Sequence, residues 1–141
     1  MSQWAPPITP DTSAWWEATR GRRLLVQRCS SCGHHQHYPR TLCLACHGAE
    51  LELVEAAGHA TVWSYSVVHR SPDPGAFEAP YVVALVRLAE GPVLTTNLVD
   101  IPHEELACDR PVQVRWRPLD DGRHLPVFGP LEADPETDPE R

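Results

Sequence analysis

Two Cys-x-x-Cys units, Cys29–Cys32 and Cys43–Cys46, constrain this chain more than any other feature, because only ten residues separate them. Each unit lets two thiolates point at one cation, and two facing units complete a tetrahedral shell of four sulfur ligands. Gly33 and Gly48 follow the units, and glycine allows the backbone to curl so that its amides approach the sulfurs. The spacing therefore predicts one structural metal site, which we expect to hold zinc.

Other interpretations of the four cysteines remain open at this stage. Iron in a rubredoxin-like site uses the same four thiolates, so the ligand set does not separate iron from zinc. Two disulfides need an oxidising compartment that nothing in the chain indicates. A thioredoxin-like redox pair needs one unit and a βαβ context, and Cys43–His47 also spells the c-type haem attachment motif. Haem attachment would leave Cys29 and Cys32 unused, so zinc is expected, with iron as the rival metal.

Composition limits the class of protein and of partner. The 141 residues are 42% hydrophobic, which is enough for one domain or for two small units that share a core. The net charge of −7 argues against a nucleic-acid backbone as the main partner. No apolar run has the length of a signal peptide or a membrane span, so we expect a cytoplasmic protein with no membrane partner.

The N-terminal part predicts an extended arm followed by a short helix. Residues 9–11 (Thr-Pro-Asp) supply a cap, a first-turn proline and a first-turn acid, so the helix is expected to start there, to include 13–19 and to stop at Gly21. Trp15 and Trp16 are neighbours in this helix and cannot share one face. We expect one to pack on the core and the other to be exposed or to cover a partner.

From residue 51 the hydrophobic pattern becomes that of strands. After a short run at 51–54, alternating β-branched and aromatic residues predict five further strands and one helical turn. The strands are 59–69, 81–88, 93–99, 112–116 and 125–128, and the helical turn is 102–106. The run 81–88 is nearly all apolar, as in a strand covered on both faces. Five strands in this arrangement indicate a small closed barrel such as an OB-fold.

These patterns divide the chain into four parts with a mostly β fold. They are an N-terminal arm and helix (1–21), a rubredoxin-like zinc ribbon (22–50), a five-stranded OB-fold barrel (51–130) and an acidic tail (131–141). The tail contains prolines and few apolar residues, so we expect it to be disordered.

No catalytic constellation is recognisable. No Ser/His/Asp set has suitable spacing, and no glycine-rich phosphate loop is present. Cys108 is a single cysteine and is predicted to be a buried thiol. His34, His35 and His37 lie between the two cysteine units, whose four thiolates already fill a metal shell, so we expect exposed loop residues. His69, at a strand end, is the most prominent polar candidate.

Several short motifs follow one another in a characteristic order: Trp15-Trp16-Glu17, Cys29-x-x-Cys32-Gly33, Tyr38-Pro39-Arg40, Cys43-x-x-Cys46, Gly58-x-x-Thr61-Val62-x-Ser64, Val68-His69, Pro80-Tyr81-x-x-Ala84, Glu90-Gly91-Pro92, Asn97-Leu98-Val99-Asp100 and Leu125-Pro126-x-Phe128. Together they resemble the zinc-ribbon/OB-fold family once catalogued as domain of unknown function 35. The resemblance covers about residues 10–130. Leu44 replaces a common proline after the third cysteine, and His37-Tyr38-Pro39 replaces a double proline, but neither departure touches a metal ligand.

The resemblance implies an accessory subunit of an acyl-CoA enzyme. Family members accompany thiolase-fold proteins, including the archaeal thiolase and hydroxymethylglutaryl-CoA synthase assembly and a retro-aldolase of steroid side-chain degradation. Related members serve a MaoC-type hydratase. All twelve basic residues are arginine, a composition that favours the bacterial versions.

We therefore expect a chain that is not an enzyme alone and that binds and shapes the acyl-CoA site of a thiolase-fold partner, with a retro-aldolase of steroid side-chain degradation as the leading candidate. A MaoC-type enoyl-CoA hydratase and an acetyl-CoA acetyltransferase are alternative partners. From another class, a nucleic-acid-binding zinc-ribbon/OB module competes with this interpretation. Trp15, Trp16, His69 and Phe77 are the expected contacts to partner or acyl-CoA, since Phe77 lies in a loop of prolines and glycine.

Overall fold

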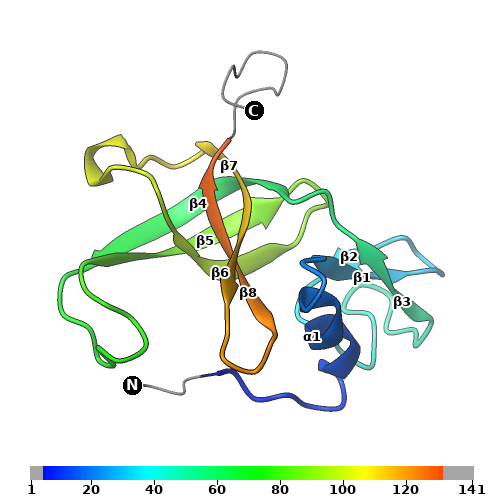
Figure 1. Cartoon of the computed structure of the whole chain (residues 1–141). Coiled ribbons are helices and arrows are strands. Elements are labelled where there is room, and N and C mark those ends of the chain that lie inside the picture. Colours follow the sequence, from blue (N-terminus) through cyan, green and yellow to red (C-terminus); the bar gives the residue numbers. More distant parts are fainter. Residues whose placement is uncertain (1–4, 132–141) are drawn as a thin grey trace, which may run out of the picture.

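The computed structural model describes residues 5–131, which form a three-stranded sheet, a closed barrel and one short helix (Figure 1). In chain order the elements are α1 (Ser13–Thr19), β1 (Leu25–Cys29), β2 (His35–Gln36), β3 (Leu51–Glu55), β4 (His59–Val68), β5 (Tyr81–Leu88), β6 (Val93–Leu98), the 3-10 helix η1 (His103–Glu105), β7 (Pro111–Pro118) and β8 (His124–Pro130). The expected disordered tail lies, from residue 132 on, outside the described residues. No helix within 5–131 is long and apolar enough to cross a bilayer.

The helix α1 begins later than the sequence predicts. The N–H of Thr12 donates to the carbonyl oxygen of Thr9 (3.0 Å), and the two threonine hydroxyls lie 3.0 Å apart. Residues 9–12 therefore form a separate turn, and the helix starts at Ser13. At the other end the helix ends at Thr19, two residues before the predicted stop at Gly21, and Arg22 takes a left-handed conformation with φ of 58°.

Both tryptophans of α1 are buried, so the expectation that one stays exposed is wrong. Trp15 is 6% and Trp16 is 8% exposed, and their rings meet edge to face at 4.7 Å between centroids. Trp15 Nε1 donates to the carbonyl oxygen of Leu25 (2.8 Å), and the guanidinium of Arg123 lies 4.7 Å over the Trp16 ring. Adjacent helical side chains do point in different directions. Here α1 contacts both β1 and β8, so each direction is covered.

The cysteine-bearing part forms a small antiparallel sheet in the order β2-β1-β3. The pairing of β1 with β3 runs from Leu25 opposite Glu55 to Cys29 opposite Leu51. The strand β3 therefore belongs to the ribbon, and the expected boundary between residues 50 and 51 cuts through this sheet. The chain crosses to the barrel only after Glu55.

The second part is a closed barrel in the order β4-β5-β6-β8-β7, which confirms the predicted five-stranded barrel. Antiparallel pairs make up most of it, and a parallel contact between Leu98 of β6 and Phe128 of β8 closes it. Along β5 the even-numbered residues 82–88 are buried, whereas Leu85 is 38% exposed. The prediction that this strand is covered on both faces is wrong, because a barrel has one interior and its outer face remains open.

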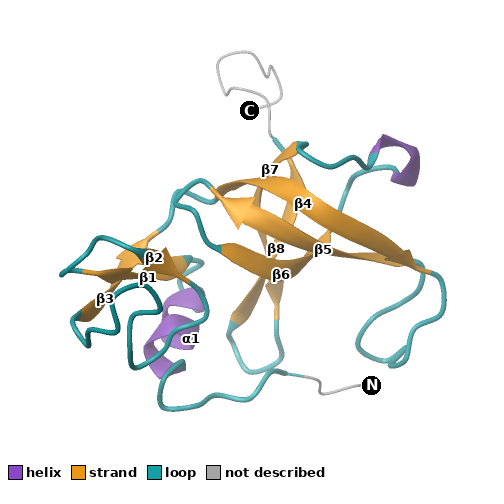
Figure 2. Cartoon of the chain, turned by 180° about the vertical axis from the view of Figure 1, so that it is seen from behind, coloured by secondary structure: helices purple, strands orange, loops and turns teal. Residues whose placement is uncertain are grey.

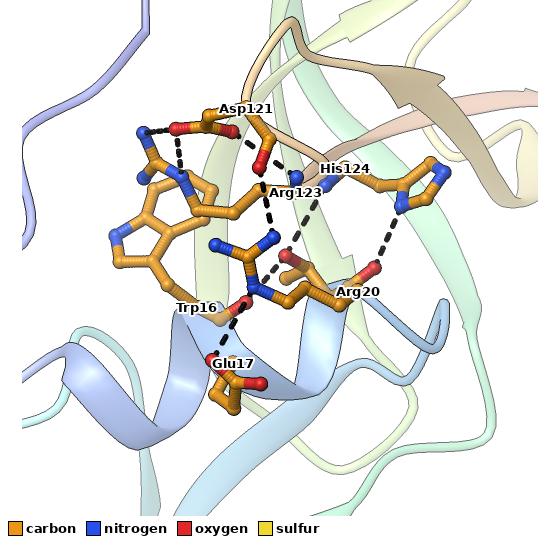
Figure 3. Close-up of polar contacts among 7 residues, drawn as sticks. Trp16, Glu17, Arg20, Asp121, Arg123 and His124 are labelled. Carbon is orange, nitrogen blue, oxygen red and sulfur yellow. Dashed lines mark hydrogen bonds and ion pairs between the residues drawn. The ribbon is translucent and has the colours of Figure 1, made fainter.

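A polar joint fastens α1 to the hairpin between β7 and β8 (Figure 3). The main-chain N–H of His124 donates to Thr19 Oγ1 (3.2 Å), and His124 Nδ1 lies 2.8 Å from the Thr19 carbonyl oxygen. Arg20 donates to the carbonyl oxygen of Asp121 (2.8 Å). Arg123, only 3% exposed, pairs with the Asp121 carboxylate at 2.7 Å, and its hydrogen bond lowers the pKa of that carboxyl. These contacts fix the position of α1 on the barrel.

Candidate metal centre and the adjoining cavity

The four cysteines predicted to bind metal converge on one point, with all four Sγ atoms within 4.8 Å of one another. Cys29 Sγ lies 3.6 Å from Cys46 Sγ, and Cys32 Sγ lies 3.7 Å from Cys43 Sγ. These separations are far longer than a disulfide bond, which measures about 2.0 Å. A tetrahedral ion with metal–sulfur bonds of about 2.3 Å would place its sulfurs roughly 3.8 Å apart. The arrangement therefore fits a metal centre with four sulfur ligands.

Backbone amides support the two cysteine turns in the same way. The N–H of Gly33 donates to the Cys29 carbonyl oxygen (2.7 Å), and the N–H of His47 donates to the Cys43 carbonyl oxygen (2.9 Å). The N–H of Gly48 also points at Cys46 Sγ, 3.4 Å away. A Cβ at Gly48 would lie 3.3 Å from that sulfur, so glycine permits the close approach. The expectation that amides approach the sulfurs is confirmed.

The pKa values of the thiols are shifted in opposite directions. The N–H of Cys32 lowers the pKa of Cys29 to about 7, and the N–H of Cys46 lowers the pKa of Cys43. The N–H of His34 favours the Cys32 thiolate, but burial and the neighbouring thiols outweigh it and raise the pKa of Cys32 to about 12. A bound cation removes this difference, because a coordinating thiol is deprotonated outright.

A pair of buried glutamines supports the second cysteine turn, and sequence reasoning missed it. Gln36 Nε2 donates to Gln27 Oε1 (2.8 Å) and Gln36 Oε1 accepts from the N–H of Leu44 (2.9 Å). Gln27 Nε2 donates to the carbonyl oxygen of Arg40 (2.7 Å), and its Oε1 accepts from the Arg40 N–H (2.9 Å). Both amides are nearly fully buried. They position the segment that carries Cys43, just as hydrogen-bonding residues around a metal site orient the metal's ligands.

An apolar cavity of about 420 Å³ lies between α1, the segment after β2, β6 and the loop joining β4 to β5. Its wall residues are Pro6, Thr12, Trp15, Trp16, His37, Tyr38, Pro39, Phe77, Tyr81, Val83, Leu94, Thr95, Thr96, Asn97, Leu125 and Pro126. Seen from both sides, α1 and the β4–β5 loop lie on different sides of the barrel (Figures 1 and 2).

His37 forms part of the cavity wall and is half-buried, so the prediction of an exposed loop histidine is wrong at this position. Its ring lies 5.5 Å from the Trp15 ring and 4.0 Å from the Tyr38 ring. Burial, with a smaller effect of the nearby Arg40 charge, lowers the pKa of His37 to about 4. Its Nδ1 is buried and has no hydrogen-bond partner among the described residues. The ring is consequently neutral near pH 7.

The remaining predicted positions fall into two groups. Phe77 is half-buried against Tyr81, with ring centroids 5.4 Å apart, and it shares the cavity wall with Trp15 and Trp16. His69 is exposed just after β4 and does not line the cavity. Cys108, predicted to be a buried thiol, is exposed because it lies in the turn between η1 and β7.

A more open groove of about 760 Å³ adjoins the cavity and shares Phe77, Tyr81 and Asn97 with it. Arg115 and Arg117 of β7 line this groove. Arg115 pairs with Asp100 at 3.1 Å, and the guanidinium of Arg117 lies 5.0 Å over the Phe77 ring. An apolar cavity thus opens beside a groove lined by two arginines and by two acids, Glu78 and Asp100.

Two family models match the chain. The model of the ChsH2 rubredoxin-like zinc ribbon domain matches residues 16–52, and that of the ChsH2 C-terminal OB-fold domain matches residues 53–117. A DUF35 domain-containing scaffold protein of Methanocaldococcus jannaschii is 33% identical to this chain, over 76% of this chain and 80% of its own length.

Two further proteins are more similar in sequence. The probable enoyl-CoA hydratase alpha subunit of Thermomonospora curvata is 44% identical over 94% of this chain, which spans only 41% of that subunit. Among solved structures, a chain of the Ltp2-ChsH2(DUF35) aldolase superposes with a TM-score of 0.82 and 45% identity, over 89% of this chain and 98% of that one.

Proposed function

Because the chain belongs to the DUF35 family of ChsH2-like proteins, which join a rubredoxin-like zinc ribbon to an OB-fold, we propose that it is a non-catalytic accessory subunit of an acyl-CoA enzyme. The family expected from the sequence motifs is thereby confirmed, and with it the mostly β fold. The metal of the ribbon is proposed to be zinc, since four thiolates in a closed shell are typical of structural zinc sites. Reduced cysteines of this kind suit the cytoplasm.

The proposed partner is a thiolase-fold retro-aldolase of steroid side-chain degradation. The observation that carries this proposal is the similarity to a chain of the Ltp2-ChsH2(DUF35) aldolase, which this chain matches over 98% of that chain's length. In such a complex the partner would supply the groups that break the carbon–carbon bond, and this chain would shape the site that holds the thioester.

A hydratase partner is the second candidate, and the similarity to the Thermomonospora curvata alpha subunit favours it. That subunit is more than twice as long as the part this chain matches. Under this alternative the hydratase machinery would lie outside the residues of this chain, which would correspond to the matching region of that subunit.

The cavity and the groove suggest how an acyl-CoA would be held. CoA carries anionic phosphates, and arginine forks match phosphate oxygens. We assign the phosphates to the groove of Arg115 and Arg117 and the acyl group to the side of Phe77, Trp15 and Trp16. The two tryptophans would then contact the acyl group from the cavity wall, and they would not contact the partner as exposed side chains.

The proposed partner surface is the outer face of β4 and β5 with His69 at its end. Trp63 is 50% exposed, Leu85 is 38% exposed, and the guanidinium of Arg87 lies 4.2 Å over the Trp63 ring. Rigid aromatic residues of this kind are frequent at interface centres. Such a group of exposed apolar side chains is typical of a protein-contact site.

Reconstitution tests this function. A thiolase-fold aldolase of the same organism is purified alone and together with this chain, and cleavage of a 3-hydroxyacyl-CoA thioester is measured. We expect turnover only with both proteins, and weakened co-purification for Trp63→Ala but not for the exposed Thr61→Ala of the same strand. Turnover by this chain alone that is lost in His69→Ala would contradict an accessory role. Activation of a hydratase instead of the aldolase would favour the second candidate.

A further inference from the structure

Three large hydrophobic side chains are exposed on the segment that leads into the second cysteine unit and forms its turn. Tyr38 is 48%, Leu42 is 50% and Leu44 is 56% exposed, and we call these three residues the ribbon tip. Leu42 and Leu44 lie close together, because the carbonyl oxygen of Leu42 and the N–H of Leu44 both bond to the side chain of Gln36, at 3.1 and 2.9 Å. Single exposed apolar side chains are ordinary, whereas a group of them is typical of an interaction site.

The first cysteine unit shows that the turn itself does not need these side chains. Both units form the same turn, closed by an N–H that donates to the carbonyl oxygen of the first cysteine. In the first unit the two residues between the cysteines are Ser30 and Ser31, and both are exposed. The second unit has Leu44 and Ala45 at the same places. The metal site therefore does not require a leucine at position 44, and its apolar surface is available to a partner.

The main chain of the ribbon tip is fixed before a partner binds. The amide of Gln27 bonds to both the N–H and the carbonyl oxygen of Arg40, at 2.9 and 2.7 Å. Cys43, between the two leucines, is buried and belongs to the metal cluster. The Tyr38 ring packs on the His37 ring, with centroids 4.0 Å apart. A surface that is already fixed loses little conformational freedom on association, which favours binding.

Charge distinguishes this segment from the rest of the chain. The chain carries a net charge of −7, yet residues 30–49 contain no aspartate or glutamate. Apart from the cysteine ligands and the histidines, the one charged side chain in this range is Arg40, which is exposed. A partner surface that is apolar at its centre and carries carboxylates at its rim would be complementary to this segment.

The ribbon tip adjoins the 420 Å³ cavity. Tyr38 is half exposed and also forms part of the cavity wall, so it lies at the rim of the cavity. The wall also contains Val83 of β5, two residues before Leu85 of the proposed partner surface and on the same outward face of that strand. An enzyme that covers the mouth of the cavity therefore meets Tyr38 as well as the outer face of β5.

We propose that the ribbon tip is a second contact surface for the acyl-CoA enzyme, and that it fits an apolar patch of that enzyme bordered by carboxylates. The inference rests on the proposed function, which supplies the occupant, and it adds a surface to the one around Trp63. The metal then has a use beyond the stability of the ribbon, because Cys43 holds the two leucines where the partner contacts them.

The test is the affinity of the full chain for the purified thiolase-fold aldolase of the same organism, measured by surface plasmon resonance. The double variant Leu42→Ser/Leu44→Ser gives the second unit the polar character of the first. We expect it to keep its metal content and melting temperature, and to bind the aldolase at least about tenfold more weakly, equivalent to about 1.4 kcal/mol. Leu131→Ser is the matched control, because Leu131 is 47% exposed and directly follows β8. It should bind within about twofold of the wild type.

Arg40→Gln tests the carboxylate rim. The substitution removes a charge and leaves the main-chain bonds to Gln27 in place. We expect weaker binding of the aldolase at low salt, with a difference from the wild type that shrinks as the ionic strength rises. Arg22→Gln, at an exposed position after α1, is the control and should follow the wild type. Wild-type affinity of Arg40→Gln at every salt concentration would overturn the carboxylate rim.

Wild-type affinity of the double variant, together with weaker binding by Trp63→Ala, would overturn the ribbon tip as a contact surface and leave the proposed function intact. Loss of metal or a lower melting temperature in the double variant would give the leucines a structural role and would also overturn it. Self-association of the wild type in sedimentation velocity that the double variant abolishes would assign the ribbon tip to a second copy of this chain instead. A wild-type chain that binds neither an aldolase nor a hydratase would overturn the proposed function together with this inference.

Discussion

The ribbon and the barrel are stabilised by different means. In the ribbon, the four cysteines and the amides of Gln27 and Gln36 hold the loops, and the buried apolar side chains are few. In the barrel, five strands close on themselves around apolar residues. The fully or nearly fully buried members of that interior are Val62, Val82, Ala84, Val86, Leu88, Leu94, Leu98, Val112 and Phe128. The ribbon is thus expected to depend on its metal, whereas the barrel depends on apolar burial.

The cavity lies at the boundary between these two parts. Its walls come from both parts, with Trp15 and His37 on the ribbon side and Phe77 and Tyr81 on the barrel side. The joint of Thr19, Arg123 and His124 holds the two parts together. Any change that loosens the ribbon, the barrel or the joint should therefore also disturb the cavity.

The largest expected effect comes from replacing a metal ligand. Cys43→Ser removes a buried thiolate, and the binding free energy at stake is of order 10–16 kcal/mol in structural zinc sites. We expect loss of bound metal and of ribbon structure, with the barrel still folded. Metal content and thermal unfolding measure both effects, and Cys108→Ser, at an exposed cysteine outside the cluster, should leave them unchanged. Full metal content in Cys43→Ser would contradict the claim that the ribbon depends on a metal held by four cysteines.

A truncation inside the barrel should have the opposite pattern. Phe128 is completely buried at the closing contact with β6, so Phe128→Ala should cost about 3–5 kcal/mol of barrel stability. Metal content should stay at the wild-type value. Chemical unfolding monitored by fluorescence measures the loss, and Phe77→Ala, on the half-buried loop, should cost less. Loss of metal from folded Phe128→Ala protein would show that the two parts are not stabilised separately.

Acid should weaken the contact between the parts through His37. Its pKa is lowered from 6.5 to about 4 in the folded chain, so the unfolded chain binds a proton that the folded chain does not. Stability attributable to this group is complete above pH 6.5 and is lost as the pH falls toward 4. The full shift corresponds to about 3 kcal/mol.

His37→Phe removes this proton linkage. Between pH 7 and pH 4 the wild type should lose about 3 kcal/mol more of its free energy of unfolding than the variant does. Denaturant titrations at each pH, on metal-loaded protein, measure the difference. His34→Phe is the control and should follow the wild type. Parallel pH curves for His37→Phe and the wild type would contradict a buried neutral imidazole.

The smallest effect is expected at the polar joint. Thr19 is completely buried, and its hydroxyl accepts the N–H of His124. Thr19→Val leaves that donor unpaired at a cost of about 1–3 kcal/mol. Metal content and the barrel interior should be unchanged, but amide exchange in α1 should quicken. Ser13→Ala, at an exposed position in the first turn of α1, is the control. Unaltered exchange in α1 of Thr19→Val would show that the joint is not what holds the helix.

Much of this architecture is predictable from local pattern. The cysteine spacing predicts the metal centre, and alternation predicts the barrel strands to within a few residues. The strand β2 has only two residues, too few to carry a period. The roles of Gln27 and Gln36 also escape sequence reasoning, because an amide on an alternating strand does not indicate that it is buried.

The predictions that were wrong concern packing between elements that are distant in the sequence. Nothing in the sequence of α1 indicates that β1 and the β7–β8 hairpin cover Trp15 and Trp16 together. Similarly, the apolar run of β5 does not reveal that a barrel leaves Leu85 on an open face. The cavity combines residues from Pro6 to Pro126, so it appears only when the whole chain is folded.

Hydrogen exchange after metal removal tests the central claim most directly. Backbone exchange is followed by mass spectrometry in the metal-loaded protein and after chelation. The account predicts that peptides from β1 to β3 lose protection on chelation, while peptides from β4 to β8 keep it. Equal loss of protection in the ribbon and the barrel, or unchanged protection in the ribbon, would contradict the claim that the metal holds one part and apolar burial holds the other.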